Sequence, residues 1–533
     1  MDETHLSPNR ALKEAIEKAI FEHSEPEPVS TPKKIVKEDP KMNEDIEPKV
    51  TMNKHGSQLH IRVDPPDNVG NTGINFTTVV DVSTSMDDEV VQKTDKGNEQ
   101  SSGHSILDLV KHCLKTFVEA TGSNDTMTLV PFSDRAIVDK DCNMLNMTEY
   151  NKKVAINSIK KLRTDGRTNI WDGIVKSLDL IRKNSANQKN FILLFTDGIP
   201  NICPPRGEVT MLQRYFDQFP DLDVSILTFG FGYNIETEKL KNLARNGQYN
   251  FIPDSSMMGS ILVNGISNVL STMATSSNLA IELGDTKVSN EEHPILGDFD
   301  YKLTSWGFDV NLGPINYGQS KDIILDVDVT SDVFCVLKYK NFQKDNEITP
   351  VVCDKIKIPE DNEQYLLNFY RLRAIDVMKN IEETLYRRGD FKDVSNQLAV
   401  FIKELETSPV KKSLFIQSMI KDFTGQITEA TSRGDWWKRW GRHYLPTIYG
   451  AYQNQVCNNF KDNAVQCFGG KLFERIQTDV ENKFTSIPLE KGTARYKYSG
   501  GARHVTRSCA ATSGSGPVSE SCRVSSTTYY NRG

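Results

Sequence analysis

Short apolar runs alternate with longer segments of helical apolar spacing between residues 74 and 275. The runs at residues 74–80, 127–132 and 224–230 are rich in β-branched and aromatic residues, which is typical of buried strands. The segments between the runs, for example residues 105–120, place apolar side chains on one face of a helix. Strands that alternate with helices predict an α/β fold with a doubly wound, mostly parallel sheet over residues 74–275.

The patterns on either side predict further parts of the molecule. Short strands broken by Gly, Pro, Asn and Asp at residues 276–358 predict a β-sandwich, to which strands within residues 50–73 are expected to contribute. Residues 359–486 have helical spacing. A mostly disordered arm with a short amphipathic helix is expected at residues 1–49, and a disordered tail at residues 487–533.

Oxygen-bearing side chains follow two of the predicted strands. Asp81, Ser83 and Ser85 come directly after the first apolar run, and Asp197 ends another buried run. These oxygens are expected to lie close together, because the carboxyl ends of parallel strands meet at one edge of a sheet. Thr168 lies in a polar loop between the two strands and adds another hydroxyl. Oxygen ligands suit a hard divalent cation such as Mg²⁺; alternatively, the two serines only cap the following helix.

The order Asp-x-Ser-x-Ser, Gly-x-Thr and Thr-Asp-Gly resembles the metal-ion-dependent adhesion site of von Willebrand factor type A domains, which have a Rossmann-like fold. The resemblance implies that Mg²⁺, or Mn²⁺ or Ca²⁺, is held by Asp81, Ser83, Ser85, Thr168 and Asp197. In that family a water or a partner's carboxylate completes the shell. The resemblance therefore implies a protein-binding module whose partner presents an Asp or Glu.

Two positions near the predicted site differ from the common pattern of that family. Arg167 stands where relatives often have a second glycine, and it could bring a cation near the site or point to solvent. Asp88 and Glu89 have the spacing at which integrin β-type domains place residues of a neighbouring metal site. The alternative for this pair is a solvated acidic start to an insertion at residues 87–103.

The helical region contains a tryptophan-rich stretch, residues 436–446. Its aromatic and basic residues could bind an acidic partner or bases, or the tryptophans could simply wedge helices together. Residues 458–473 and 314–322 resemble an intracellular subgroup of type A domain proteins, some of which carry ubiquitin-ligase or hedgehog/intein-like modules. No such module is recognisable in the sequence, so an association with ubiquitin transfer rests on the resemblance alone.

Composition narrows the function classes. The formal net charge of -7 argues against a nucleic-acid-binding protein. The sequence contains no run of about 20 apolar residues, so no membrane span is predicted. No secretory signal is recognisable at the start. The 9 cysteines are odd in number and dispersed, which together with the lack of a signal indicates reduced thiols. They include no Cys-x-x-Cys pair, the spacing that would suggest a zinc finger. These features together predict an intracellular, cytoplasmic protein.

Two other functions remain open. A non-enzymatic scaffold with a vestigial metal site would need no intact ligand set. A metal-assisted hydrolase would need a general base near the metal, but no His lies in the three ligand loops. The sequence also has no Gly-x-Ser-x-Gly elbow and no phosphate-binding loop. We therefore expect a binding module and not an enzyme.

Overall fold

A computed structural model describes residues 47–67, 73–93, 99–184, 188–284, 287–288, 294–329, 333–342, 347–490 and 492. All of these residues belong to one compact unit, residues 1–495. The predicted N-terminal arm with its amphipathic helix lies outside the described residues, except for its last three positions. The predicted C-terminal tail also lies outside them after residue 492.

A central sheet of six strands has the order β10-β9-β8-β3-β6-β7, and only β7 runs antiparallel to its neighbour. The strands are β3 (Ile74–Asp81), β6 (Thr126–Phe132), β7 (Leu145–Asn146), β8 (Lys189–Thr196), β9 (Ser225–Phe231) and β10 (Tyr249–Ile252). Every residue of β3 and β8 is buried, as expected for central parallel strands that are covered on both faces. This sheet confirms the predicted α/β fold.

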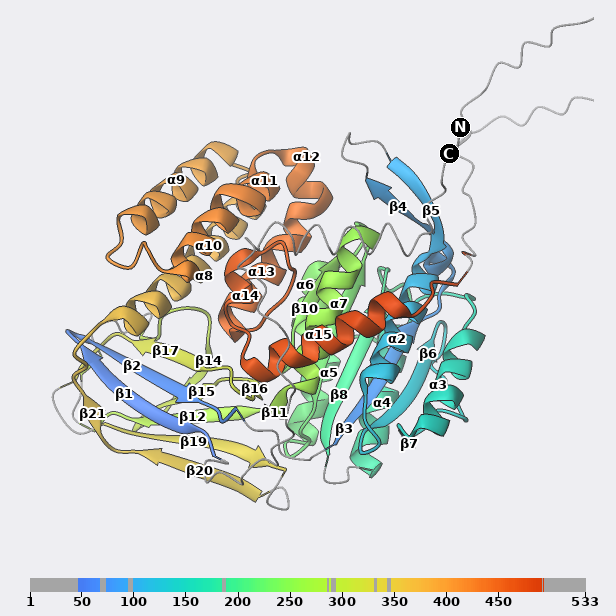
Figure 1. Cartoon of the computed structure of the whole chain (residues 1–533), viewed down its shortest axis with the longest axis horizontal. Coiled ribbons are helices and arrows are strands. Elements are labelled where there is room, and N and C mark those ends of the chain that lie inside the picture. Colours follow the sequence, from blue (N-terminus) through green and yellow to red (C-terminus); the bar gives the residue numbers. More distant parts are fainter. Residues whose placement is uncertain are drawn as a thin grey trace, which may run out of the picture. The chain divides into compact units, whose positions relative to one another are not determined.

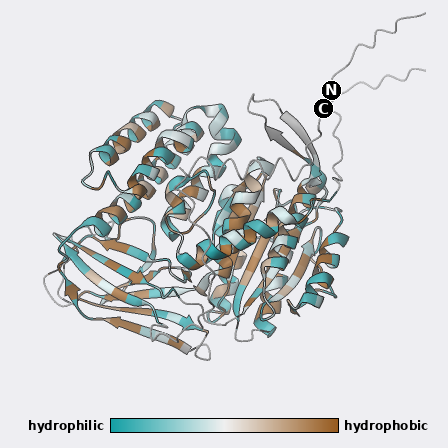
Figure 2. Cartoon of the chain, viewed as in Figure 1, coloured by the Kyte–Doolittle hydropathy of each residue, from teal (hydrophilic) through white to brown (hydrophobic). Residues whose placement is uncertain are grey.

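Helices cover both faces of this sheet (Figure 1). They are α2 (Ile106–Ala120), α3 (Glu149–Lys161), α4 (Ile170–Asn184), α5 (Glu208–Gln218), α6 (Thr237–Leu243) and α7 (Ser255–Leu270). Val79 packs in one core with Ile174 of α4, whereas its neighbour Val80 packs in another core with Val110 of α2. Successive strand residues thus point to opposite faces, and both faces are apolar. Figure 2 shows the resulting apolar strands, while the helices are hydrophilic on the outside.

The polar insertion predicted after the first strand contains a hairpin. A 3-10 turn, η1 (Thr84–Asp87), leads from β3 into β4 (Glu89–Lys93), which pairs with β5 (Glu99–Ser105). The sequence pattern did not indicate these strands, because the insertion lacks apolar alternation.

Two larger sheets share a third core (Figure 1). The strand orders of these sheets are β17-β2-β1-β21 and β14-β15-β12-β19-β20. Two separate two-stranded sheets consist of β11-β16 and β13-β18. Antiparallel pairing of β2 with β17 joins segments on either side of the α/β part in the sequence. The strands are β1 (Lys49–His55), β2 (Gln58–Asp64), β11 (Thr272–Ala274), β12 (Ser277–Glu282), β13 (Lys287–Val288), β14 (Asp300–Leu303), β15 (Gly307–Asn311), β16 (Ile315–Asn316), β17 (Lys321–Leu325), β18 (Val327–Asp328), β19 (Phe334–Asn341), β20 (Glu347–Cys353) and β21 (Ile356–Lys357).

The last described part is helical, as the spacing predicted. Its elements are α8 (Glu363–Arg387), α9 (Phe391–Thr407), α10 (Leu414–Asp422), η2 (Phe423–Ile427), α11 (Thr428–Thr431), α12 (Gly434–Trp436), η3 (Trp437–Gly441), α13 (Arg442–Asn454), α14 (Asn463–Gln466) and α15 (Lys471–Ser486). Here η3 is a single π-helical turn, whereas η2 contains a kink at Gly425, whose backbone is non-helical (φ -98°, ψ -109°). Phe484 of α15 lies edge-on to His112 of α2, with ring centroids 4.6 Å apart, so the last helix packs on the α/β part. Among the described helices, none has the length and hydrophobicity that crossing a bilayer requires.

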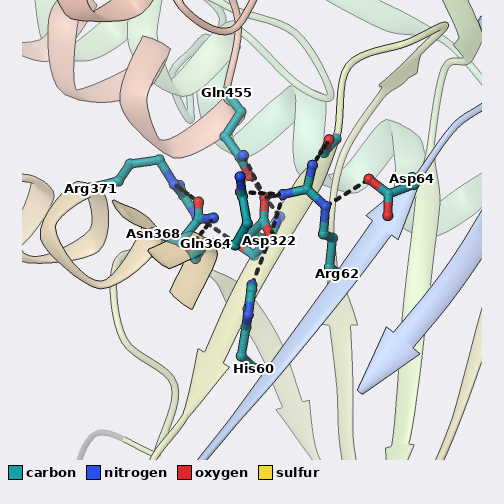
Figure 3. A network of polar contacts seen from close by, with 9 residues as sticks. His60, Arg62, Asp64, Asp322, Gln364, Asn368, Arg371 and Gln455 are labelled. Carbon is teal, nitrogen blue, oxygen red and sulfur yellow. Dashed lines mark hydrogen bonds and ion pairs between the residues drawn. The ribbon is translucent and has the colours of Figure 1, made fainter. Parts of the chain in front are cut away.

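A buried polar network joins these parts around Asp322 of β17 (Figure 3). Its Oδ1 lies 2.7 Å from His60 Nε2 and 3.2 Å from Arg62 Nη1 on β2. Arg371 of α8 donates to the Asp322 backbone oxygen at 2.6 Å. Gln455 donates to Asp322 Oδ2 at 3.0 Å and accepts from the Asp322 amide at 2.7 Å. One carboxylate therefore links the two-stranded segment before the α/β part to the helices after it.

Candidate metal centre

The predicted metal ligands lie at the carboxyl edge of the central sheet. Asp81 is the last residue of β3, and Ser83 and Ser85 follow it into η1. Asp197 follows β8, which pairs in parallel with β3. The extended β3 strand and its immediate turn thus bring the side chains of both strand ends to the same place.

Hydrogen-bond distances separate the oxygens of this group. Ser83 Oγ lies 3.1 Å from Ser85 Oγ, and Ser85 Oγ donates to Asp197 Oδ1 at 2.9 Å. Thr168, the fifth predicted ligand, and Ser85 both lie close to Gly198. A Cβ atom placed on Gly198 would lie 3.5 Å from Thr168 Oγ1 and 3.8 Å from Ser85 Oγ. The fold therefore collects all five predicted side chains, with Asp81 directly beneath Ser83, as its hydrogen bonds indicate.

Asp81 is held at both carboxylate oxygens. The Ser83 amide donates to Asp81 Oδ1 at 2.8 Å, and Thr196 Oγ1 donates to Asp81 Oδ2 at 2.6 Å. Asp81 is fully buried, with 0% of its surface exposed. These contacts fix the orientation of the carboxylate before any ligand arrives. Thr196 was not predicted as part of the site, although it directly precedes Asp197 in the sequence.

The loop with Thr168 is fixed by backbone contacts. Asn201 accepts from the Thr168 amide at 3.0 Å through its side chain, and its own amide donates to the Thr168 carbonyl at 3.1 Å. Asp134 accepts from the Arg167 amide at 3.1 Å. Sequence analysis missed Asn201 and Asp134, because they lie in loops without a recognisable motif and act on backbone groups.

The electrostatics of this group fit a cation. Burial, followed by the neighbouring charge of Asp81, raises the pKa of Asp197 to about 7. Burial also raises the pKa of Asp81, against the lowering effect of its hydrogen bonds. Two carboxylates that disfavour each other's charge in a buried place are stabilised by a nearby positive ion. Two carboxylates and three hydroxyls are also the donor types that Mg²⁺ accepts.

The structure also shows contacts of the two departures from the family pattern. The Arg167 side chain is 64% exposed, and its Nε lies 3.0 Å from Asp134 Oδ1. It therefore follows the solvent-facing alternative. Glu89 accepts from the Gly103 amide at 3.1 Å. A second metal site at Asp88 and Glu89 stays a prediction.

Comparisons with known proteins match the part of the chain that carries this group. The family model described as "von Willebrand factor type A domain" matches residues 75–262. Inter alpha-trypsin inhibitor, heavy chain 4, from Mus musculus is 25% identical over 187 residues, which are 34% of this chain and 18% of that protein. Inter-alpha-trypsin inhibitor heavy chain H3 from the same organism is 26% identical over 179 residues, or 32% of this chain and 18% of that protein. The matched segment is therefore a small fraction of these relatives.

A second family model, described as "VWA / Hh protein intein-like", matches residues 413–482. It corrects the prediction that no hedgehog- or intein-like segment is recognisable. The block at residues 458–473, whose resemblance to proteins with type A domains was noted from the sequence, lies within this match.

A solved structure is similar over a larger part of the chain. It is described as "von Willebrand factor type A from Catenulispora acidiphila", with a TM-score of 0.53, 12% identity, and coverage of 76% of this chain and 96% of that one. At this identity the similarity concerns the fold alone, and it extends beyond the segment that the domain model matches. Residues 75–262 of this chain are a von Willebrand factor type A domain.

Proposed function

We propose that this chain is a metal-dependent protein-binding module. Type A domains typically mediate contacts between proteins, and this chain contains such a domain. The observation that carries the finer proposal is the position of Ser85 Oγ, which lies 3.1 Å from Ser83 Oγ in its own loop and 2.9 Å from Asp197 Oδ1 in a sequence-distant loop at the same sheet edge. Hydroxyl and carboxylate oxygens at this separation are suited to surround one divalent cation.

In this proposal Ser83, Ser85, Thr168 and Asp197 hold Mg²⁺, or Mn²⁺ or Ca²⁺, and Asp81 orients the serines and contributes its charge. When bound, the ion supplies a positively charged open position for a partner's Asp or Glu carboxylate. Ser85 is partly exposed, whereas Asp81, Ser83 and Thr168 are buried, so the cluster opens towards solvent at Ser85. The protein itself keeps these oxygens in place and leaves the cluster accessible at Ser85.

We also propose that the centre binds and does not catalyse. Within the described part of the chain, the hydrogen-bond partners of the five residues include no histidine, and the carboxylates among them, Asp81 and Asp197, are themselves proposed to hold the ion. His104, the nearest histidine to the first loop in sequence, lies 3.1 Å from the backbone oxygen of Glu490 instead. The alternative function, a non-enzymatic scaffold with a vestigial metal site, differs from this proposal only in that it requires no bound metal.

Peptide arrays test the proposal. The full chain is applied, in Mg²⁺ or in chelator, to peptides with a central Asp or Glu and to matched peptides with Asn or Gln. We expect capture that needs both Mg²⁺ and the carboxylate, and that Ser85→Ala abolishes. Asp165→Ala is the matched control, because Asp165 is an exposed acid in the Thr168 loop. Equal capture in chelator, or equal capture by the amide peptides, would contradict the proposal.

A further inference from the structure

A cavity of about 520 Å³ lies where the ends of β9 and β10 meet the helical part of the chain. Five aromatic side chains line it, and none of the five predicted metal ligands does. Its size lies within the range of small-molecule sites. The aromatic lining residues are Tyr233, Phe251, Trp436, Trp440 and Tyr444.

Amide side chains with unused hydrogen-bonding capacity also line this cavity. Asn458 is only 2% exposed, yet neither its Nδ2 nor its Oδ1 has a hydrogen-bond partner among the described residues. Asn459 Nδ2 and Gln426 Oε1 are also buried without a hydrogen-bond partner among the described residues. Buried polar groups are normally paired, because an unpaired one keeps the cost of its desolvation. These atoms therefore indicate a missing partner in the cavity.

The kinds of unpaired atom restrict the chemistry of that partner. Asn458 and Asn459 offer N–H donors, whereas Asn458 and Gln426 offer acceptor oxygens. A carboxylate or phosphate only accepts hydrogen bonds, so it would leave both acceptor oxygens unpaired. An ammonium or guanidinium only donates, so it would leave the donors unpaired. A neutral group with a donor beside an acceptor satisfies both kinds.

The charged residues of the cavity agree with a neutral occupant. The guanidinium of Arg433 lies 4.5 Å from the ring centroid of Trp436, and that of Arg439 lies 5.3 Å from the centroid of Tyr233. The chain's own cations therefore already occupy these two ring faces. An anion would meet an excess of acidic residues, since the lining has four against two basic ones: Asp254, Glu429, Asp435 and Asp462.

The backbone around the cavity is irregular in two places. Gln426 follows the kink at Gly425 within η2, and Trp440 belongs to the π-helical turn η3. π-Helical turns are rare and are found frequently at functional sites. Gln426 and Trp440 line the same space.

We propose that this cavity binds a small neutral ring whose edge carries a hydrogen-bond donor beside an acceptor. Nucleobases and ring carboxamides share this chemistry. The side chain of an asparagine can pair with such an edge through two hydrogen bonds. The ring then packs against Trp440 and Tyr444, whose own centroids are 5.3 Å apart.

Saturation-transfer NMR on the full chain tests this site. Adenosine and cytidine represent nucleobases, and nicotinamide represents ring carboxamides; benzoate, benzylammonium and glucose represent an anion, a cation and a sugar. We expect at least one of the first three to bind saturably, and the other three to bind at least about tenfold more weakly. The preference between nucleosides and nicotinamide identifies the source of the ring.

Variants connect the binding to this cavity. Asn458→Leu and Trp440→Leu are each expected to weaken binding at least about tenfold. The first removes the amide that would hydrogen-bond to the bound ring, and the second removes the aromatic side chain against which the bound ring would pack. Trp306→Leu is the control, because Trp306 is 41% exposed and does not line the cavity. If Asn458→Leu loses its circular dichroism spectrum, the half-buried Trp440 decides the result.

Three results would overturn the proposal: no saturable binding of any neutral ring, tighter binding of a comparison probe, or unchanged affinity in the folded variants. Chelator is expected to leave ring binding unchanged, so this test is independent of the metal proposal.

Discussion

Thr196→Val removes one hydroxyl from the candidate metal centre and keeps all five predicted ligands. Thr196 Oγ1 donates to Asp81 Oδ2 at 2.6 Å, within a site that is fully buried at both residues. This hydrogen bond lowers the pKa of Asp81, against burial, so it favours the ionised carboxylate that a cation needs. A hydrogen bond to a charged group contributes about 2 kcal/mol. Its loss corresponds to about 30-fold weaker metal binding.

Isothermal titration with Mn²⁺ measures this effect. Thr228→Val is the matched control, because Thr228 is equally buried in the same sheet but donates to the Leu240 carbonyl at 3.0 Å. We expect the control to bind Mn²⁺ like the parent chain. Parent-like affinity in folded Thr196→Val would refute the idea that this hydroxyl prepares Asp81 for a cation.

Other predictions concern the buried network and the site rim. Asp322→Asn is expected to lower the free energy of unfolding by about 3 kcal/mol or more at neutral pH, because it leaves Arg62 without its buried counter-charge. Urea denaturation measures this free energy, and a loss below about 1 kcal/mol would contradict the prediction. Burial alone would raise the pKa of Asp322, but His60, Arg62 and Arg371 lower it to about 2, below its ordinary value of 3.8. This stabilisation, about 2 kcal/mol, is present above the ordinary value and is lost as the pH falls towards 2, so the difference between parent and Asp322→Asn should shrink there. Arg167→Ala is expected to change Mn²⁺ affinity less than about threefold, since its exposed side chain contacts Asp134; a larger change in titration would place its charge at the metal.

Local patterns were sufficient to predict much of the fold. β3 and β8 are rich in apolar and β-branched residues, and such segments predict buried central strands without any knowledge of their neighbours. The group of Asp81, Ser83 and Ser85 was also predictable, because a strand end and a short turn fix their spacing. Their role as metal ligands stays a prediction that only a bound ion can test.

Non-local features were not predictable in the same way. The contact of Asn201 with Thr168 joins two loops whose sequences carry no complementary pattern. The unpaired Asn458 became visible only when the packing of the helices on β9 and β10 defined a cavity. Within the tryptophan stretch, Trp437 is 5% exposed and packs in the core, as the wedge interpretation predicts, and Trp440 packs partly against the same core and lines the cavity. Binding of an acidic partner or of bases by this stretch stays a prediction.

Direct titration of Mg²⁺ and Mn²⁺ into the full chain, beside Ser85→Ala and Asp197→Ala, tests the central claim. Ser85 and Asp197 are joined by one hydrogen bond of 2.9 Å, so both variants remove an oxygen from the same place. We expect the parent to bind a single ion at this centre and each variant to bind it at least about tenfold more weakly, with unchanged circular dichroism. A parent chain that binds neither ion at millimolar concentration, or folded variants that bind as tightly as the parent, would contradict the metal-dependent account.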